Sequence, residues 1–200
     1  MTRKLVEFYF DVGSPAAYLA WTQLPRICAQ AGARIDYRPM LLGGVFQATG
    51  NHSPMTVPAK GRYVLGDLER FARRYDAPFS HNPFFPINTL TLMRMLTALQ
   101  MRDEARMQTC ADAFFRAIWV DGKNMNDAEV VAQVLHGAGF DPAELLAQAG
   151  SPQAKERLKT VTQDAVARGV FGAPTFFVGS HMYWGQDRLD FVKEALEQQA

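Results

Sequence analysis

The hydrophobic positions of the chain change their period several times, and each change predicts an element. Leu5–Phe10 is an apolar run of strand length. Apolar residues then recur at helical spacing over Pro15–Ala31, and a second strand run, Ala33–Arg38, follows. A strand, a helix and a strand in succession predict a parallel βαβ unit with a right-handed crossover.

The next 20 residues have no clear period. Residues 40–59 are rich in Gly, Asn, Ser, Thr and Pro, so we predict a long loop there. Its apolar side chains argue against disorder, and we expect this loop to line or cover a site. From residue 60 to residue 168 the apolar spacing is helical throughout, which predicts a block made only of helices.

The end of the chain returns to a period of two. Thr175–Val178 and Met182–Trp184 read as strands joined by a short loop, Gly179–His181. A closing amphipathic helix follows, and we expect Asp187 to cap it. The complete order is therefore βαβ, a helical insertion, ββ and α, which indicates the α/β class.

Composition excludes several classes of function. The 21 basic and 20 acidic residues are mixed along the chain, unlike the basic footprint of a nucleic-acid-binding protein. No apolar run approaches the ~20 residues that cross a membrane, and Glu7 and Asp11 interrupt what would be a secretory signal. We therefore expect neither nucleic acid nor membrane as a partner.

The residues that bind metals or form disulfides are few. Cys28 and Cys110 are the only cysteines and lie at apolar helix positions, so we expect buried free thiols in a reducing cytoplasm. The histidines have no metal-ligand spacing, and we assign no metal: His52, His81, His136 and His181. Walker, GxGxxG and GxSxG motifs are also absent.

Ser14 is the first candidate for chemistry. Ser14–Pro15 stands where the first strand gives way to the first helix, and Ser before Pro is a strong helix-start signal. The hydroxyl would lie beside the positive end of the helix, which favours an anion. The alternative is that Ser14 is a helix cap and nothing more.

The order of elements is the thioredoxin-like arrangement. In thioredoxin-like oxidoreductases a CxxC motif begins the first helix, but this chain has Ser14–Ala17 there and no thiol, which excludes disulfide exchange. Gly172–Thr175 stands where such folds carry a cis proline. We predict a thioredoxin-like domain made of residues 1–59 and 169–200, with residues 60–168 as an inserted helical domain.

The chain resembles the DsbA-like branch that contains 2-hydroxychromene-2-carboxylate isomerase and the kappa-class glutathione transferases. The matching motifs are FYFDVGSPAAYLA, LLGGVFQATGN, FGAPTFFVG and WGQDRL, and they occur in order near both ends. The resemblance covers essentially the whole chain. It implies glutathione as the cofactor and Ser14 as the residue that hydrogen-bonds its sulfur.

The resemblance also implies where glutathione and substrate bind. The residues assigned to glutathione are Ser14, Asn51, Ala173, Pro174, Gly185, Gln186, Asp187 and Arg188. Two of these have simpler alternatives, a helix cap for Asp187 and an ordinary turn for Asn51. The residues assigned to an aromatic substrate are Phe46, Lys60, Phe84, Phe85, Asn88 and Trp184, with Arg188 as a second possible cation. Their alternatives are core packing, solvated charge and, for Asn88, a helix cap.

The implied reaction is a cis–trans isomerisation of an aromatic pyruvate through reversible addition of the glutathione thiolate. The chain departs from the isomerases at residues 45–47, where a Lys is expected and none is present. Two alternatives stay open: a kappa-like transferase or peroxidase, and a cysteine-less binding module. Relatives imply a homodimer.

Overall fold

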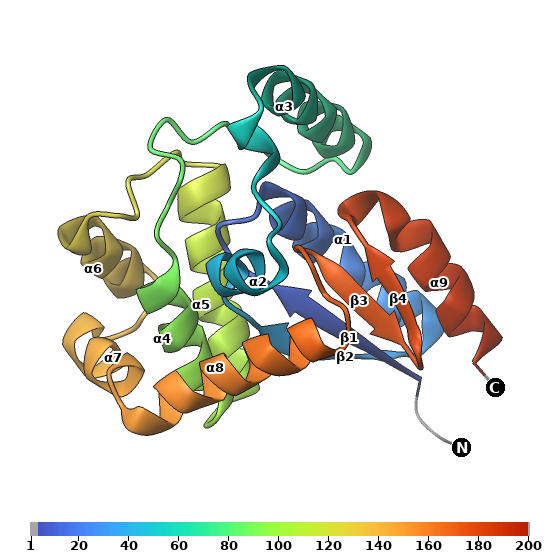
Figure 1. Ribbon diagram of the computed structural model, residues 1–200. Coiled ribbons are helices and arrows are strands. Elements are labelled where there is room, and N and C mark those ends of the chain that lie inside the picture. Colours follow the sequence, from blue (N-terminus) through green and yellow to red (C-terminus); the bar gives the residue numbers. More distant parts are fainter. Residues whose placement is uncertain (1–3, 200) are drawn as a thin grey trace.

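The computed structural model describes residues 4–199, which build a four-stranded mixed sheet covered by helices (Figure 1). The strand order is β2-β1-β3-β4. The strands are β1 Leu5–Phe10, β2 Arg34–Pro39, β3 Thr175–Val178 and β4 His181–Trp184. β1 pairs parallel with β2 and antiparallel with β3, and β3 pairs antiparallel with β4. This confirms the predicted βαβ and ββ units.

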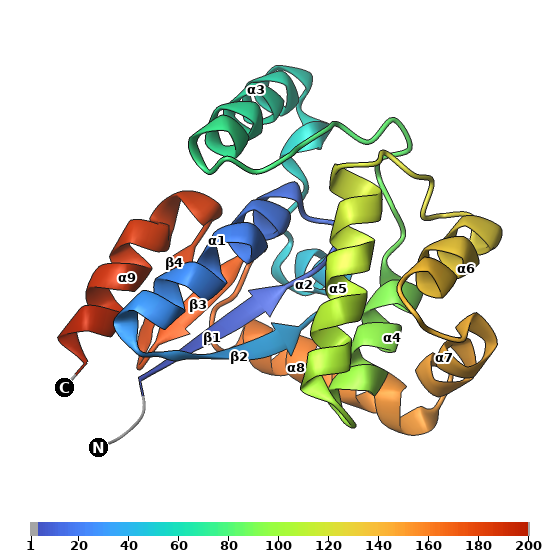
Figure 2. The ribbon, with the colours of Figure 1, turned by 180° about the vertical axis from the view of Figure 1, so that it is seen from behind.

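Helices cover both faces of the sheet. α1 Pro15–Ala31 and α9 Leu189–Gln198 lie side by side on one face (Figure 2). On the other face α8 Pro152–Ala167 packs with the short α2 Leu42–Thr49. The remaining helices are α3 Pro58–Arg74, α4 Leu90–Gln100, α5 Glu104–Trp119, α6 Ala128–Gly137 and α7 Pro142–Ala149. Residues 60–168 thus contain helices and no strand, as predicted.

The alternation of side chains along β1 divides the core in two. Phe8 and Phe10 are fully buried in the main core, which extends through α1, α4, α5 and α9. Tyr9 points to the opposite face and packs with Val45 of α2 and Val161 of α8 in a smaller cluster. Successive residues of a strand face opposite sides of a sheet, so a single strand anchors both layers.

The prediction of one long loop over residues 40–59 was wrong. That segment contains α2, a 3₁₀ turn η1 Pro54–Thr56 and the start of α3. Gly43 and Gly44 weaken the local helix signal. However, Val45 is buried against α8, and a Cβ at position 44 would lie 3.3 Å from the Thr162 side chain. Tertiary packing, rather than propensity, stabilises this helix.

Two smaller predictions near the end of the chain were also wrong. His181 belongs to β4, because the turn uses only Gly179, at φ 61°, and Ser180. Asp187 does not cap the closing helix: it lies within a 3₁₀ turn, η2 Gln186–Arg188, and α9 begins without a side-chain cap. The Asp187 carboxylate is therefore available for another contact. None of the helices described is long and apolar enough to cross a membrane.

Candidate active site

Ser14 links the start of α1 to the loop before β3. Its Oγ accepts a hydrogen bond from the Ala17 amide at 3.1 Å, so it caps the helix as predicted. The same hydroxyl donates to the Ala173 carbonyl at 3.0 Å, a contact across 159 residues. Because the Ala17 amide holds the oxygen in place, the hydroxyl proton can turn to another acceptor without moving a heavy atom. Ser14 is thus more than a cap.

The Ala173–Pro174 peptide is cis, as expected, and the loop around it is held by hydrogen bonds from separate segments. Four consecutive carbonyls each accept one: Phe171 from Asn51 Nδ2 at 2.8 Å, Gly172 from Thr175 Oγ1 at 2.8 Å, Ala173 from Ser14, and Pro174 from the Gly185 amide at 3.0 Å. Three residues that the sequence analysis assigned to glutathione, Ser14, Asn51 and Gly185, therefore donate hydrogen bonds to this loop.

The Ala173 amide is not engaged within this loop, and neither are the amides of Phe171 and Gly172 among the described residues. Within residues 4–199 the Ala173 amide donates to no acceptor, and Ala173 is partly exposed. The Ala16 amide, in the first turn of α1, belongs to those that helix geometry leaves without an intrahelical acceptor. The Ala16 amide belongs to the positive end of α1, two residues after Ser14, and the Ala173 amide belongs to the residue whose carbonyl accepts from the Ser14 hydroxyl. This edge can bind an anion beside an extended peptide group.

Asp11 is a candidate site residue that the sequence analysis missed. Its buried carboxylate accepts from the Gly13 amide at 2.9 Å, the Leu42 amide at 2.8 Å and Thr89 Oγ1 at 3.0 Å. Burial raises the pKa of Asp11, although these three hydrogen bonds act to lower it. One carboxylate therefore joins the end of β1 to the starts of α2 and α4. The only local signal is Asp two residues before Gly, typical of an Asx turn.

Close packing fixes the residue before Ser14. A Cβ at position 13 would lie 2.8 Å from the Thr89 methyl group, so only glycine fits between β1 and α4. On the other side, Trp119 Nε1 donates to the Val12 carbonyl at 2.8 Å. The Phe85 ring lies 5.9 Å from the Trp119 ring and is 36% exposed. Phe85 is therefore linked to the segment before Ser14 through Trp119, which contacts the Phe85 ring and donates a hydrogen bond to Val12.

The turn at residues 185–188 adds acidic and amide groups beside the loop. Gly185 has φ 101°, and a Cβ there would collide with Asp187 Oδ1, so the carboxylate folds back over the glycine. The Gln186 carbonyl accepts from the hydroxyl of Tyr75, the residue directly after α3, at 2.8 Å. Arg188 lies 3.5 Å from Asp187 and is half exposed. The Gln186 side chain makes no hydrogen bond within the described part of the chain.

Asn51 and Asn88, two predicted site residues, make hydrogen bonds that stabilise the local backbone. The Asn51 amide holds the Phe171 carbonyl while its oxygen accepts from the His52 amide at 2.8 Å. Asn88 Oδ1 accepts from the Leu90 amide at 3.2 Å, but the N-cap residue of α4 is Thr89, so Asn88 precedes the cap and the cap alternative was wrong in detail. Asn51 therefore positions the loop, and Asn88 stabilises a helix end.

The proposed substrate residues are more scattered. Trp184, 48% exposed, covers Gly172 and packs at 5.0 Å from the Phe171 ring, directly on the cis-proline loop. Phe46 is half-buried on α2, and Lys60 is exposed on α3 with no ion-pair partner among residues 4–199. Phe84 is 48% exposed. No hydrogen bond, ion pair or aromatic contact among the described residues links Phe46, Phe84 or Lys60 to Ser14.

The chain provides no reactive thiol at this site. Cys28 and Cys110 are buried and free, as predicted. Burial raises the pKa of Cys28 to about 12 and also raises that of Cys110. Across residues 4–199, no group of His, Cys, Asp and Glu side chains is arranged to hold a metal ion. Thiol chemistry beside Ser14 would need a thiol from outside the chain.

Comparison with known proteins defines the class first. The model of the DSBA-like thioredoxin domain matches residues 5–197, and the chain belongs to this family. The 2-hydroxychromene-2-carboxylate isomerase of Sphingobium xenophagum is 32% identical over 195 residues, which are 96% of this chain and 98% of that protein. Within the DsbA-like proteins, the chain is therefore a member of the 2-hydroxychromene-2-carboxylate isomerase family.

Two further similarities agree with this assignment. A solved structure of 2-hydroxychromene-2-carboxylate isomerase matches with a TM-score of 0.84 and 30% identity, covering 96% of this chain and 94% of that one. Glutathione S-transferase kappa 1 of Caenorhabditis elegans is 27% identical over 205 residues, 96% of this chain and 91% of that protein. The fold class and the family inferred from the sequence are confirmed.

Proposed function

We propose that this protein is a glutathione-dependent cis–trans isomerase that acts on 2-hydroxychromene-2-carboxylate or a related aromatic pyruvate. The observation that carries the proposal is the Ser14 hydroxyl, held at the N-terminus of α1 and 3.0 Å from the Ala173 carbonyl beside the cis proline. The names of the isomerase and kappa transferase relatives support it.

The residues around Ser14 fit glutathione. The unpartnered Ala173 amide offers a donor to the cysteinyl part of the tripeptide, as a thioredoxin-like loop does to an extended peptide. Gln186 and Asp187 offer an amide and a carboxylate to its γ-glutamyl end, and Asp187 is not engaged in capping α9. Asn51, Gly185 and Pro174 contribute by holding this loop in place.

Glutathione, when bound, supplies a thiolate that adds reversibly to a conjugated double bond and so permits rotation about it. The task of the chain is to favour that thiolate. A thiol with an ordinary pKa near 8.5 is only a few per cent ionised at pH 7, and lowering the pKa by one unit is worth about 1.4 kcal/mol. The Ser14 hydroxyl, the Ala16 amide and the end of α1 together provide the donors and the positive potential.

The substrate needs a flat pocket and a cation. Phe85 and Trp184 are the aromatic side chains connected to the Ser14 region, through Trp119 and Phe171 respectively. Arg188 and Lys60 are the cations we assign to the substrate carboxylate. Since the lysine expected at residues 45–47 is absent, we expect the ring substituents of the substrate to differ from those of 2-hydroxychromene-2-carboxylate.

Ser14→Ala tests the proposal by titration calorimetry with glutathione at pH 7 in two buffers of different ionisation enthalpy. The wild type should bind saturably and release a proton. A hydrogen bond to a charged group is worth about 1.5–3 kcal/mol, so the variant should bind the thiolate roughly 10- to 100-fold more weakly and release less of a proton.

Ser151→Ala is the matched control. Ser151 also precedes a proline and caps a helix, accepting from the Ala154 amide at 3.2 Å, but it has no contact with the cis-proline loop. Both variants should lose about 1 kcal/mol of stability, and only Ser14→Ala should lose glutathione binding. Equal glutathione affinity in all three proteins would sink the proposal.

A kappa-like glutathione transferase is the second candidate, favoured by the kappa relatives. Both enzymes use the same thiolate, but a transferase consumes glutathione and an isomerase does not. Titration of free thiol during turnover of aromatic pyruvates separates them. A constant thiol concentration supports the isomerase, and a stoichiometric loss supports the transferase.

A further inference from the structure

A cavity lies away from Ser14, between α2, α4 and α8. Its volume is about 640 Å³, within the range of small-molecule sites. Its walls are mostly apolar and come from Leu41, Leu90, Leu158 and Val166, with Gly44 and Ala48 on the α2 side. None of the residues that surround Ser14 lines it, so it is a separate feature of the fold.

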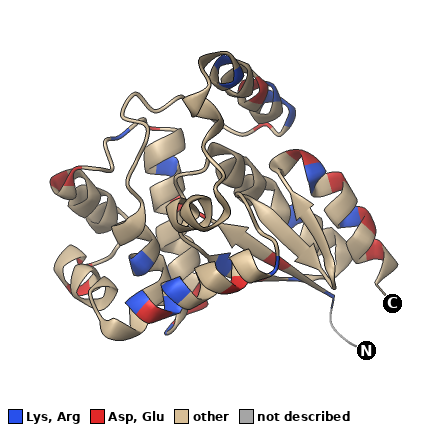
Figure 3. Ribbon diagram, in the orientation of Figure 1, with Lys and Arg blue, Asp and Glu red and all other residues tan. Residues whose placement is uncertain are grey.

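Basic side chains surround this apolar cavity. Arg94 of α4 and Lys155 and Lys159 of α8 line it, together with a single acidic residue, Glu156. Figure 3 shows basic positions on α4 and on α8 on the same side of the molecule, beside α2. Lys159 lies 3.7 Å from Glu156, so these two charges compensate each other. The cavity therefore keeps a positive charge from the other two residues.

Arg94 is the most informative of these residues. It is half-buried, and within residues 4–199 its guanidinium makes no ion pair and no hydrogen bond. Most arginines either pair with a carboxylate or extend into water. A guanidinium has five donors in a rigid fork that matches a carboxylate, and next to an apolar wall this pairing is stronger than in water. Arg94 is thus placed to receive an anionic group that enters with an apolar body.

The spacing on α8 explains how one helix supplies both the wall and the rim. Leu158, Thr162 and Val166 recur every four residues and form the wall, while Lys155 and Lys159 border it. Thr162 also accepts from the Leu41 amide at 3.0 Å and so fixes the start of α2 against the cavity. The cavity is therefore amphipathic: its floor is apolar and its edge carries basic side chains.

We propose that this cavity binds a small apolar carboxylic acid, an aryl- or alkyl-alkanoate, whose carboxylate pairs with Arg94 and Lys155 while its hydrocarbon part lies on Leu90, Leu158 and Val166. The charge complementarity selects a carboxylate over a neutral molecule, and the volume limits its size. This binding does not depend on glutathione at Ser14.

Calorimetry with octanoate and 3-phenylpropanoate, each beside its neutral amide, tests the proposal. The wild type should bind both acids saturably, with a Kd below about 1 mM, and bind the amides more weakly. Arg94→Gln should weaken acid binding by about tenfold or more and leave amide binding unchanged, because it removes the charge and keeps the polar end. Ala48→Phe, which fills the cavity from α2, should weaken both.

Two further variants make the outcome specific. Arg157→Gln removes an exposed charge from the same helix outside the cavity and should leave acid binding unchanged. Ser14→Ala should also leave it unchanged, even if it abolishes glutathione binding. The proposal is overturned if the wild type binds neither acid up to about 5 mM. It is equally overturned if Arg94→Gln binds the acids normally, or if Ser14→Ala or added glutathione abolishes acid binding.

Discussion

Ser14 and Ser151 show how far a single residue can be interpreted from its neighbours in sequence. Both precede a proline, and both accept a hydrogen bond from the amide three residues further on. Only Ser14 also reaches a carbonyl 159 residues away. The local pattern predicts the cap in both cases, whereas the contact with the Ala173 carbonyl, which makes Ser14 a candidate site residue, is set by the fold.

Asp11 leads to the first residue-scale prediction. In Asp11→Asn the amide can accept only on one side, so at least one of the donors Gly13, Leu42 and Thr89 loses its acceptor inside the protein. We expect a loss of about 1–3 kcal/mol in the free energy of unfolding, measured in urea at pH 7. Glutathione affinity should fall as well, since Asp11 holds Gly13 beside Ser14.

Thr89→Val is the control for this prediction. Valine keeps the methyl group against Gly13 and removes a single donor to Asp11, so it should cost less than Asp11→Asn. If Asp11→Asn unfolds at the same urea concentration as the wild type, the carboxylate is not what joins the three segments.

Residue-level prediction from sequence was successful where the signal was local or belonged to a shared motif. The cap at Ser14 and the cis proline at residue 174 are confirmed. The hydrogen bond between Asp11 and Thr89 joins residues 78 positions apart, and no local sequence pattern predicts it. The same holds for Trp119, whose indole reaches Val12 across 107 positions.

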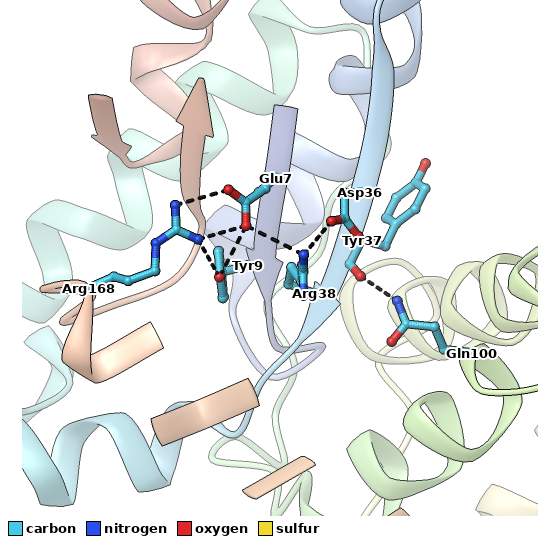
Figure 4. A network of polar contacts seen from close by, with 7 residues as sticks. All are labelled: Glu7, Tyr9, Asp36, Tyr37, Arg38, Gln100 and Arg168. Carbon is cyan, nitrogen blue, oxygen red and sulfur yellow. Dashed lines mark hydrogen bonds and ion pairs between the residues drawn. The ribbon is translucent and has the colours of Figure 1, made fainter. Parts of the chain in front are cut away.

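At the scale of elements, the end of α8 is fastened to the sheet just before the cis-proline loop begins. Arg168 donates to both carboxylate oxygens of Glu7, at 2.7 and 3.0 Å, and to the Tyr9 hydroxyl at 2.8 Å (Figure 4). Its guanidinium also lies 3.7 Å from the centre of the Phe177 ring. Arg38 joins the same network and pairs with Asp36 at 2.6 Å. Arg168 therefore holds the start of the loop that carries Ala173 against β1.

Arg168→Gln should remove this attachment. Burial acts to raise the pKa of Glu7, but the hydrogen bonds and charge of Arg168, together with the Arg38 charge and the Tyr9 hydroxyl, lower that pKa below its ordinary 4.5. The pair is partly exposed, so we expect a loss of roughly 1 kcal/mol at pH 7 after allowing for screening by water. A lowered carboxyl pKa stabilises the fold above the ordinary value, and this stabilisation is lost as the pH falls through the lowered pKa.

Urea unfolding of wild type and Arg168→Gln from pH 7 down to about pH 3 measures this. The difference between them should be constant near neutrality and shrink in acid. Arg157→Gln, an exposed arginine of the same helix, should match the wild type throughout. A difference that does not change with pH would show that Arg168 acts through its packing on Phe177 and not through Glu7.

The elements themselves were mostly predictable because their hydrophobic periods are strong. The helices of residues 60–168 and the four strands of the described sheet have clear patterns, and each strand was predicted to within one residue at either end. α2 was missed because its sequence, LGGVFQAT, has two adjacent glycines and only one buried residue, Val45. Its stability comes from α8, far along the chain, and a local pattern carries no information about that partner.

At the scale of the whole molecule, the main core does not stop at the boundaries of the predicted inserted domain. It includes Phe8 and Phe10 of the sheet and continues to Phe114 and Phe115 of α5. The Phe10 and Phe115 rings lie 6.1 Å apart, and the Gln100 side chain donates to the Tyr37 carbonyl of β2 (Figure 4). Shared packing of this kind couples the unfolding of the parts that share it.

The two cysteines can test this coupling, because Cys28 lies in α1 of the predicted thioredoxin-like domain and Cys110 in α5 of the predicted insertion. Both thiols are buried, and burial raises both pKa values, so neither should react with a thiol reagent in the native protein. Because both lie in one core, we expect them to become reactive at the same urea concentration, measured by pulse labelling and mass spectrometry. Cys28→Ala and Cys110→Ala assign each label, and the fluorescence midpoint of each variant corrects for its cavity. Two separate labelling midpoints would mean that residues 60–168 unfold as a domain of their own despite the shared core.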